Sequence, residues 1–337
     1  MTLTIKFNRP MKRNIAIVWG GYSSEIIVSE KSMSGVYSFL DKEKYNIHKV
    51  KIVRESWTVN ADGEIYPVDK NDFSFTHPQK GEKIKFDFAF IIIHGTPGED
   101  GRLQGYLDML NIPYSTCGMM ASSLTMNKFV CNNFLKNFGI RVADSLYLNK
   151  DTRCSIDDIA AKLGFPMFVK PNTGGSSFAT TKVKSIEQLQ KAIDIAFGET
   201  PEVIIESFIN GQEVTCGCYK IKGKEVVFPI TEVVTPNEFF NYEAKYEGQV
   251  EEITPARIPD EMTNEIQRLT RRIYDMVGAK GIIRVDFIIS DNIPYLLEVN
   301  TVPGMTQTSF IPQQVAAAGL NITDVLTEII ENEFNAN

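Results

Sequence analysis

The chain has 337 residues, of which 43% are hydrophobic and 23% charged, and this is enough for two or three domains with ordinary cores. Its net charge of -7, without a long Lys/Arg stripe, argues against a nucleic-acid partner. No apolar run of about 18 residues is present, no signal-peptide core precedes the first strand, and the five cysteines follow no zinc spacing. We therefore expect a cytoplasmic protein with reduced thiols, no membrane segment and no nucleic-acid partner.

The first elements predict an α/β domain with a parallel sheet. Apolar runs at residues 14–19, 47–53 and 87–93 have the near-continuous character of strands covered on both faces, and a helix is expected at residues 29–40. A glycine pair follows the first strand, as in the opening of a βα unit. The dinucleotide fingerprint G-x-G-x-x-G is missing, which argues against a nicotinamide-dependent oxidoreductase.

The third strand leads directly into H-G-T-P-G-E-D-G at residues 94–101, and an amphipathic helix follows. Glycines at the carboxyl end of such a strand mark the place where open α/β sheets bind ligands. His94 could contact that ligand, or it could be a structural histidine whose hydrogen bonds are satisfied in the core. The pattern leaves both interpretations open.

The central third of the chain predicts a phosphate-binding site. A helix is expected over residues 126–138, and a strand at residues 165–170 ends in V-K-P. The Gly/Ser-rich loop at residues 172–180 offers backbone N–H groups, and Lys128 and Lys170 offer cations, to a polyphosphate. The loop is not a Walker A loop, because the G-K-[ST] order is absent, and a flexible linker is the alternative.

A strand at residues 203–209 is followed by a turn and a second strand at residues 213–221. An apolar slot beside Phe208, with Glu206 and Glu213 near it, could hold a purine and its ribose. The alternative is a plain buried hairpin.

Residues 235–257 form a long segment without a predicted element, rich in charged and aromatic side chains. Segments of this length are usually functional loops or disordered, and Tyr242, Lys245 and Tyr246 favour a functional loop. The helix expected next, at residues 262–277, has one apolar face and is structural.

The most informative stretch is a predicted β-hairpin in which two apolar runs flank Ser290-Asp291-Asn292. With the turn centred on Asn292, Asp286 lies opposite Glu298, and Arg284 lies opposite Asn300. Because strand side chains alternate between the two faces, all four side chains project from one face. The other face is covered by the apolar side chains of Val285, Phe287, Leu297 and Val299.

The polar face of this hairpin carries ligands for a hard cation. Two carboxylates and an amide, without Cys or His, suit Mg²⁺, whose remaining ligands are normally phosphate oxygens. Arg284 would face the negative charge beside the metal, and the N–H groups of Gly304 and Met305 could form an oxyanion hole. The alternative is a surface hairpin with solvated polar positions.

Taken together, these segments resemble the D-alanine:D-alanine ligases, which are ATP-grasp carboxylate-amine ligases, over nearly the whole chain. Any one matching motif would be weak evidence, whereas the motifs of this chain stand together in the family's order. They are G-G-Y-S-S-E, H-G-T-P-G-E-D-G-R-L-Q-G, M-N-K, V-K-P-N-T-G-G-S-S, N-Y-E-A-K-Y, R-V-D-F, E-V-N-T-V-P-G-M-T and S-F-I-P.

The resemblance implies an α/β and α+β fold with the three-domain ATP-grasp architecture. It places an N-terminal Rossmann-like parallel-sheet domain at residues 1–119, a central subdomain at 120–206 and a C-terminal subdomain with the metal site at 207–337. It implies that one D-alanine is phosphorylated by ATP and that a second attacks the acyl phosphate. D-alanyl-D-alanine, ADP and phosphate would be released, for peptidoglycan synthesis, by an enzyme that tends to form homodimers.

The resemblance also implies the nucleotide contacts. Lys128 and Lys170 would hold the α and β phosphates, and Lys245 would reach the γ-phosphate. Two Mg²⁺ or Mn²⁺ ions would be bound by Asp286, Glu298 and Asn300. The full set of expected nucleotide contacts is Lys128, Lys170, Gly175, Ser176, Ser177, Glu206, Ser207, Phe208, Ile209, Glu213 and Lys245.

For the amino-acid substrates, the resemblance implies that Glu25 orients the first ammonium group, with His94 nearby. Ser176 and Tyr246 would link to Glu25 and latch two loops over the acyl phosphate, which hydrolyses in water. In the later steps, Arg284 and the Gly304 N–H would stabilise the tetrahedral oxyanion. The carboxylate of the second D-alanine would be bound by Ser309.

Some positions depart from the family pattern. Ile26 and Ile27 stand where the family usually has a basic and then an acidic residue, Ala179 stands where glycine is usual, and Asn127 replaces an acidic residue. The nearest alternative function is a ligase that uses D-lactate, and Tyr246 argues against it, because depsipeptide-forming members commonly lack this tyrosine. A nucleotide-binding regulatory protein is less consistent with the intact metal trio and lysines.

Overall fold

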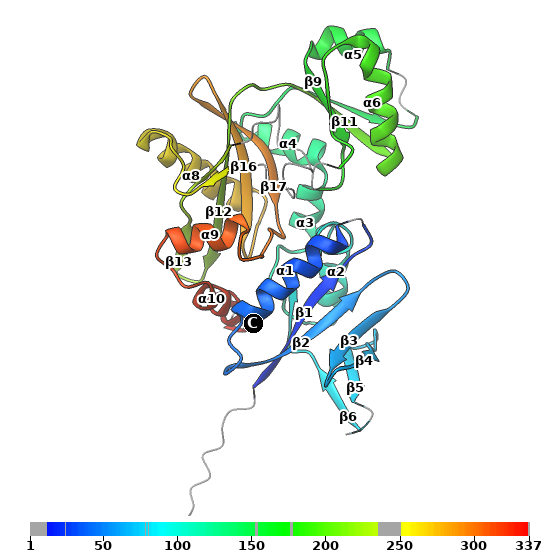
Figure 1. Cartoon of the computed structure of the whole chain (residues 1–337), viewed down its shortest axis with the longest axis vertical. Coiled ribbons are helices and arrows are strands. Elements are labelled where there is room, and N and C mark those ends of the chain that lie inside the picture. The colour runs from blue at the N-terminus through cyan, green and yellow to red at the C-terminus, as the bar shows by residue number, and fades with distance from the viewer. Residues whose placement is uncertain are drawn as a thin grey trace, which may run out of the picture.

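The described part of the chain forms three main β-sheets and a separate two-stranded hairpin, and Figure 1 shows the main sheets in three parts of the molecule. The computed structural model describes residues 12–23, 25–77, 79, 81–151, 154–175, 178–234 and 251–335. No helix in these ranges combines the length and the apolar character that crossing a membrane requires.

The N-terminal sheet has five strands in the order β4-β3-β2-β1-β7. β1 (Arg13–Gly20) lies parallel to β2 (Tyr45–Ile52) and to β7 (Phe88–Ile91), as the apolar runs predict. Antiparallel strands β3 (Trp57–Ala61) and β4 (Glu64–Pro67) extend the sheet, and β5 (Ser74–His77) pairs with β6 (Glu82–Lys85). Helices α1 (Ile26–Phe39) and α2 (Arg102–Met109) follow the carboxyl ends of β1 and β7.

Both faces of this sheet are buried, because alternate residues of β1 enter different cores. Ile15 and Ile17 pack with α1 and with the last helix, α10 (Ile322–Asn335). Ala16 and Val18 pack on the opposite face with residues of α2 and β5. Burial on both faces explains why the apolar run of β1 does not alternate with polar residues.

The small part at the end of the molecule opposite the N-terminal sheet contains a four-stranded antiparallel sheet, in the order β10-β9-β11-β8 (Figure 1). Its strands are β8 (Ser145–Asn149), β9 (Met167–Pro171), β10 (Thr181–Val183) and β11 (Glu202–Ser207). Helices α5 (Ile156–Leu163) and α6 (Ile186–Glu199) pack against it around Ile159 and Leu189.

The hairpin alternative for residues 203–221 is wrong. β11 pairs with β8 and β9, whereas β12 (Gln212–Ile221) belongs to the C-terminal sheet. Residues 208–211 therefore connect two sheets, and Phe208 and Ile209, which the expected strand included, lie beyond the end of β11. The strand pattern was correct, but it contained no information about which sheet each strand joins.

The C-terminal sheet has six strands, with β15-β14-β12-β16-β17 in order and β13 paired to β12. The bounds not yet given are β13 (Lys224–Val227), β14 (Thr231–Val234), β15 (Glu251–Ile253), β16 (Ile283–Ser290) and β17 (Ile293–Asn300). Helix α8 (Asp260–Met276) covers one face, and α9 (Phe310–Ala317) and α10 cover the other. β15 occupies part of the segment expected to have no element, of which residues 235–250 lie outside the described ranges.

Residues 126–138 form parts of two helices rather than the single expected one. Helix α3 (Met119–Met126) ends where α4 (Lys128–Lys136) begins. Asn127 separates them with φ -88° and ψ 97°, and its Oδ1 accepts the N–H of Val130 at 3.0 Å. Asparagine is a favoured N-cap residue, so the departure at Asn127 has a structural role. Lys128 is the first residue of α4.

The polar register of the C-terminal hairpin is confirmed: Asp286 pairs with Glu298, and Arg284 pairs with Asn300. The turn and the apolar face require correction. Asp291 and Asn292 both have positive φ and form a two-residue turn, and a β-bulge beside Asp286 adds one residue to β17. Consequently Leu296 packs in the core, where Leu297 was expected, and Leu297 lines a cavity.

Candidate active site

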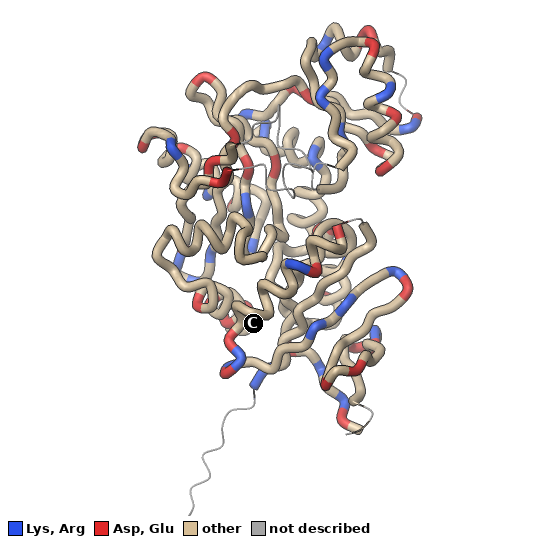
Figure 2. Tube along the Cα trace, viewed as in Figure 1, with Lys and Arg blue, Asp and Glu red and all other residues tan. Residues whose placement is uncertain are grey.

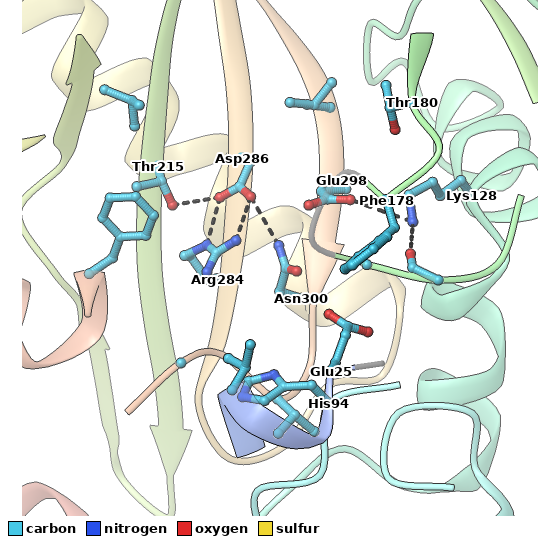
Figure 3. A pocket seen from close by; sticks show the side chains of 18 of the residues that line it. Glu25, His94, Lys128, Phe178, Thr180, Thr215, Arg284, Asp286, Glu298 and Asn300 are labelled. Atoms are coloured by element: carbon cyan, nitrogen blue, oxygen red, sulfur yellow. Dashed lines mark hydrogen bonds and ion pairs between the residues drawn. The ribbon is translucent and has the colours of Figure 1, made fainter. Parts of the chain in front are cut away.

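A cavity of about 1550 Å³ lies among the three main sheets. Its walls come from α1, the segment after β7, the start of α4, β9, β11, and the hairpin β16–β17 with the loop that follows. Figure 3 shows Asp286, Asn300 and Glu298 on one side of the hairpin, with Glu25 and His94 facing them from the N-terminal part. Figure 2 shows acidic and basic residues close together on the strands of the C-terminal sheet.

Asp286 is the centre of a hydrogen-bond network in this cavity. Arg284 donates to both carboxylate oxygens from Nε and Nη2, each at 2.8 Å. Thr215 donates to Oδ1 at 2.6 Å, and Asn300 Nδ2 donates to Oδ2 at 3.0 Å. Burial alone would lower the pKa of Arg284, but the adjacent Asp286 carboxylate raises it above its usual value. A charged bidentate pair with further donors fixes the carboxylate in one orientation.

Replacing Thr215 with valine should lower the turnover number roughly 10-fold while the fold is kept. Valine preserves the shape but removes the O–H donor, and a hydrogen bond to a charged group contributes about 1.5–3 kcal/mol. Steady-state kinetics would measure the change. Thr215→Ser keeps the hydroxyl and should restore most of the rate, whereas equal rates in the valine variant and the unchanged protein would contradict the expected role.

The two predicted phosphate lysines are each paired with a glutamate. Lys128 Nζ lies 3.6 Å from Glu298 Oε2 and donates to Gly174 O in the Gly/Ser-rich loop. Lys170 Nζ lies 2.6 Å from Glu206 Oε2. Both lysines and both glutamates line the cavity, so the cations that the sequence singled out lie in one site.

The Gly/Ser-rich loop approaches Glu25. A Cβ on Gly175 would lie 2.8 Å from Glu25 Oε1, so a side chain here would displace the end of the Glu25 side chain. Ala179 has a φ of 51°, in the left-handed region that costs an L residue about 1–2 kcal/mol and that glycine adopts freely. Ile27, another of the departures, is 59% exposed on α1, whereas Glu25 lines the cavity.

His94 is buried at the edge of the cavity, with Nε2 3.3 Å from Ser32 Oγ. The same Ser32 oxygen accepts the N–H of Met305 at 3.4 Å, which connects α1 with the loop after β17. Burial, and next the charge of Arg284, lower the pKa of His94 to about 4. The imidazole is therefore neutral near pH 7, and it is both hydrogen-bonded and in contact with the cavity.

The low pKa of His94 predicts a specific acid sensitivity. The pKa is 6.5 in an unperturbed chain and about 4 in the folded protein, so the unfolded state takes up a proton first as the pH falls. The contribution of His94 to the free energy of unfolding is therefore greatest above pH 6.5 and decreases as the pH falls toward 4. Urea unfolding at pH 7 and pH 5 should show a smaller loss of stability for His94→Gln than for the unchanged protein, and identical losses would contradict this prediction.

Glu99 lies in the H-G-T-P-G-E-D-G segment and lines the cavity near Glu25. Its Oε2 accepts the N–H of Gly95 at 2.7 Å. Burial, and next the charge of Glu25, raise the pKa of Glu99 to about 8. Glu99 therefore retains its proton in a large share of molecules near neutral pH, which limits its repulsion of Glu25.

The loop between β17 and α9 brings Gly304 and Ser309 together. A Cβ on Gly304 would lie 3.0 Å from Ser309 Oγ. Ser309 Oγ accepts the N–H of Thr306 at 3.0 Å and lies 2.7 Å from its hydroxyl oxygen. Both Gly304 and Ser309 line the cavity on the side where Arg284 lies over the ring of Phe310, 5.2 Å from its centroid.

The expected purine slot is also part of this cavity. Phe208 packs against Phe168, with 5.9 Å between ring centroids, and Lys182 Nζ lies 3.8 Å from the Phe208 centroid. These contacts hold the Phe208 ring at the edge of the site. Nucleotide contacts expected on this side that line the cavity are Glu206, Ser207, Phe208, Ile209 and Glu213.

Sequence reasoning missed the residues that support the site from distant elements. Asn132 of α4 donates to Glu206 at 3.3 Å. Ser32 contacts His94, and Thr215 contacts Asp286, as described above. No motif or spacing connects such partners, because they meet only in the folded chain. Four expected site residues lie outside the described ranges: Ser176, Ser177, Lys245 and Tyr246.

Two family models match this chain. The model described as D-ala D-ala ligase N-terminus matches residues 14–117, and the model described as D-ala D-ala ligase C-terminus matches residues 134–331. The D-alanine–D-alanine ligase of Parabacteroides distasonis is 62% identical over 326 residues, covering 96% of this chain and 98% of that protein. The enzyme of the same name from Bacteroides fragilis is 61% identical, covering 96% of this chain and all of that protein.

Solved structures resemble the whole fold. The VanG D-Ala:D-Ser ligase of Enterococcus faecalis superposes with a TM-score of 0.84 at 31% identity, covering 96% of this chain and all of that one. The D-alanine–D-alanine ligase of Bacillus anthracis complexed with ATP superposes with a TM-score of 0.76 at 33% identity, covering 96% of this chain and 98% of that one. These neighbours confirm the expected ATP-grasp fold, and the N-terminal sheet is mixed, with three parallel strands extended by two antiparallel ones. The motifs, the fold and the family models agree, and the chain therefore belongs to the D-alanine–D-alanine ligase family of enzymes.

Proposed function

We propose that this enzyme ligates two D-alanines to D-alanyl-D-alanine with ATP, through an acyl phosphate, and releases ADP and phosphate for peptidoglycan precursor synthesis. The observation that carries the proposal is that Lys128 and Lys170 line the same cavity as the Asp286 network. A polyphosphate bound at the lysines would extend toward the hairpin. Family membership and the ATP complex of a similar structure support the same conclusion.

In this proposal Glu25 binds the ammonium group of the first D-alanine beside the neutral His94. The γ-phosphoryl group is transferred to the carboxylate of that substrate. The amine of the second D-alanine then attacks the acyl carbon and loses a proton, and phosphate leaves. Arg284 and the Gly304 N–H stabilise the tetrahedral oxyanion, and Ser309 binds the second carboxylate.

The polar face of the hairpin fits Mg²⁺ or Mn²⁺, because Asp286, Glu298 and Asn300 offer oxygen donors on one face. Within the described ranges, no three His, Cys, Asp or Glu side chains are placed to hold a metal by themselves. Phosphate oxygens and water would supply the remaining ligands. When bound, two such ions would neutralise charge on the transferring phosphoryl group.

The remaining expected contacts stay part of the proposal. Ser176 and Tyr246 latch the loops to Glu25, Ser177 belongs to the phosphate loop, and Lys245 reaches the γ-phosphate. Water is excluded from the acyl phosphate when these loops are closed.

We further propose the division into residues 1–119, 120–206 and 207–337, because each range carries one of the three main sheets, apart from Ser207 at the end of β11. A cytoplasmic homodimer is proposed on family resemblance. Gel filtration with light scattering would measure the mass in solution, and a monomer would contradict the homodimer.

The deciding experiment measures phosphate release from ATP and Mg²⁺ with D-alanine, D-alanine plus D-lactate, D-alanine plus D-serine, or L-alanine, and identifies products by mass. Release with D-alanine alone and a dipeptide product are expected. Release that requires D-lactate or D-serine would move the assignment of the second substrate. No release under any condition would refute the ligase function and favour a nucleotide-binding regulatory protein.

A further inference from the structure

The N-terminus of α4 is held by Asn172, the residue that directly follows β9. The first N–H groups of a helix have no partner within the helix. In α4, the N–H of Lys128 donates to Asn172 O at 3.1 Å, and the N–H of Phe129 donates to Asn172 Oδ1 at 2.9 Å. Asn127 accepts the N–H of Val130. Asn172 therefore satisfies two of the three donors at the start of this helix.

The other polar groups of Asn172 bind β11. Nδ2 donates to Glu202 Oε2 at 2.8 Å, and the backbone N–H donates to Glu202 O at 3.0 Å. β11 lies beside β9, with Ile204 opposite Lys170. Asn172 is itself 0% exposed, and its partners Phe129 and Glu202 are half-buried. One buried side chain thus connects α4, β9 and β11.

These connected elements carry both proposed phosphate lysines, and this inference rests on the proposed ATP-dependent function. Lys128 is the first residue of α4, and Lys170 lies two residues before Asn172. A lysine side chain is a flexible four-carbon stem, so the position of its ammonium group depends on where its backbone is held. We propose that Asn172 is a positioning residue that sets the spacing of the two ammonium groups for the phosphates of one nucleotide.

A double-mutant cycle separates positioning from simple support of the fold. Asn172→Ala, Lys128→Met and the double variant would be compared by calorimetric titration with ATP plus Mg²⁺ and with adenosine. Asn172→Ala should weaken ATP binding about 10-fold and adenosine binding less than about 2-fold. When Lys128→Met is already present, adding Asn172→Ala should weaken ATP binding by no more than about 2-fold. Lys128, through which Asn172 acts, is then already missing.

Asn137→Ala is the matched control, because Asn137 lies at the other end of α4 and bonds only within that helix among the described contacts. It should bind ATP like the unchanged protein. The proposal would be overturned if Asn172→Ala weakened ATP binding equally with and without the Lys128→Met change. It would also be overturned if Asn172→Ala weakened adenosine binding as much as ATP binding. Either result would show a structural role. If Asn172→Ala does not fold, Asn172→Ser retains a hydroxyl acceptor and should give a smaller shift of the same pattern.

Dipeptide formation by the unchanged protein, measured in parallel, distinguishes the two hypotheses. Its failure would refute the ligase function itself. Normal dipeptide formation, together with unchanged ATP affinity in the folded Asn172 variants, would refute only the positioning role.

Discussion

An Asp286→Asn variant should form dipeptide at least about 100-fold more slowly than the unchanged protein. The carboxylate accepts hydrogen bonds from Arg284, Thr215 and Asn300, and an amide offers one acceptor oxygen in place of two. The change also removes one negative charge from the proposed metal ligands. A bound metal ion stabilises charge in the transition state by several kcal/mol. Each 1.36 kcal/mol lost slows the reaction about tenfold. Phosphate release with saturating D-alanine and ATP would measure the loss.

The matched control is Asp291→Asn in the turn of the same hairpin. Asp291 is exposed and has a φ of 50°, a conformation that asparagine tolerates. Both substitutions remove one charge from one hairpin, but only the first alters the cavity. Turnover within about 3-fold of the unchanged protein in Asp286→Asn, or equal losses in both variants, would refute the metal and oxyanion assignments at this hairpin.

Replacing Lys170 with methionine should reduce both stability and ATP binding. Glu206 is 5% exposed and lies 2.6 Å from Lys170, so the substitution leaves a buried carboxylate without its cation. Breaking a buried pair in this way typically costs about 3–5 kcal/mol of the free energy of unfolding. The proposed contact to the β-phosphate is lost as well, and the Michaelis constant for ATP should rise by at least about 10-fold.

The double variant Lys170→Met with Glu206→Gln separates the two effects. Removing the orphaned charge should restore most of the stability measured by urea unfolding, because no buried carboxylate then lacks a partner. ATP binding should remain weak. Recovery of ATP affinity in the double variant would mean that Lys170 acts on Glu206 alone and makes no contact with the nucleotide.

The hairpin illustrates how much the sequence can predict about the site. Alternation placed Asp286, Glu298 and Asn300 on one face, and the structure has that face. The register agreed because two deviations cancel: the turn lies half a residue earlier than expected, and the bulge at Leu297 adds one residue. A bulge depends on the packing of neighbouring strands, which the local pattern does not contain.

Partners distant in sequence could not be predicted. Thr215 lies on β12 and meets Asp286 only because β12 and β16 pair, and Asn172 meets Phe129 only when β9 packs beside α4. Helix and strand existence follows local periodicity, whereas these contacts depend on the order of strands in the sheets. The same reason explains the incorrect hairpin alternative at residues 203–221.

The placement of α10 against the N-terminal sheet has a consequence for biosynthesis. Ile15 and Ile17 of β1 share their apolar core with Ile329 and Ile330 of α10, far along the chain. A nascent chain must therefore keep part of one face of its first sheet exposed until α10 has left the ribosome. Contacts between such distant segments slow folding and leave aggregation-prone surface in the meantime. We expect fragments that lack α10 to require a chaperone or to precipitate, even though their N-terminal strands are complete.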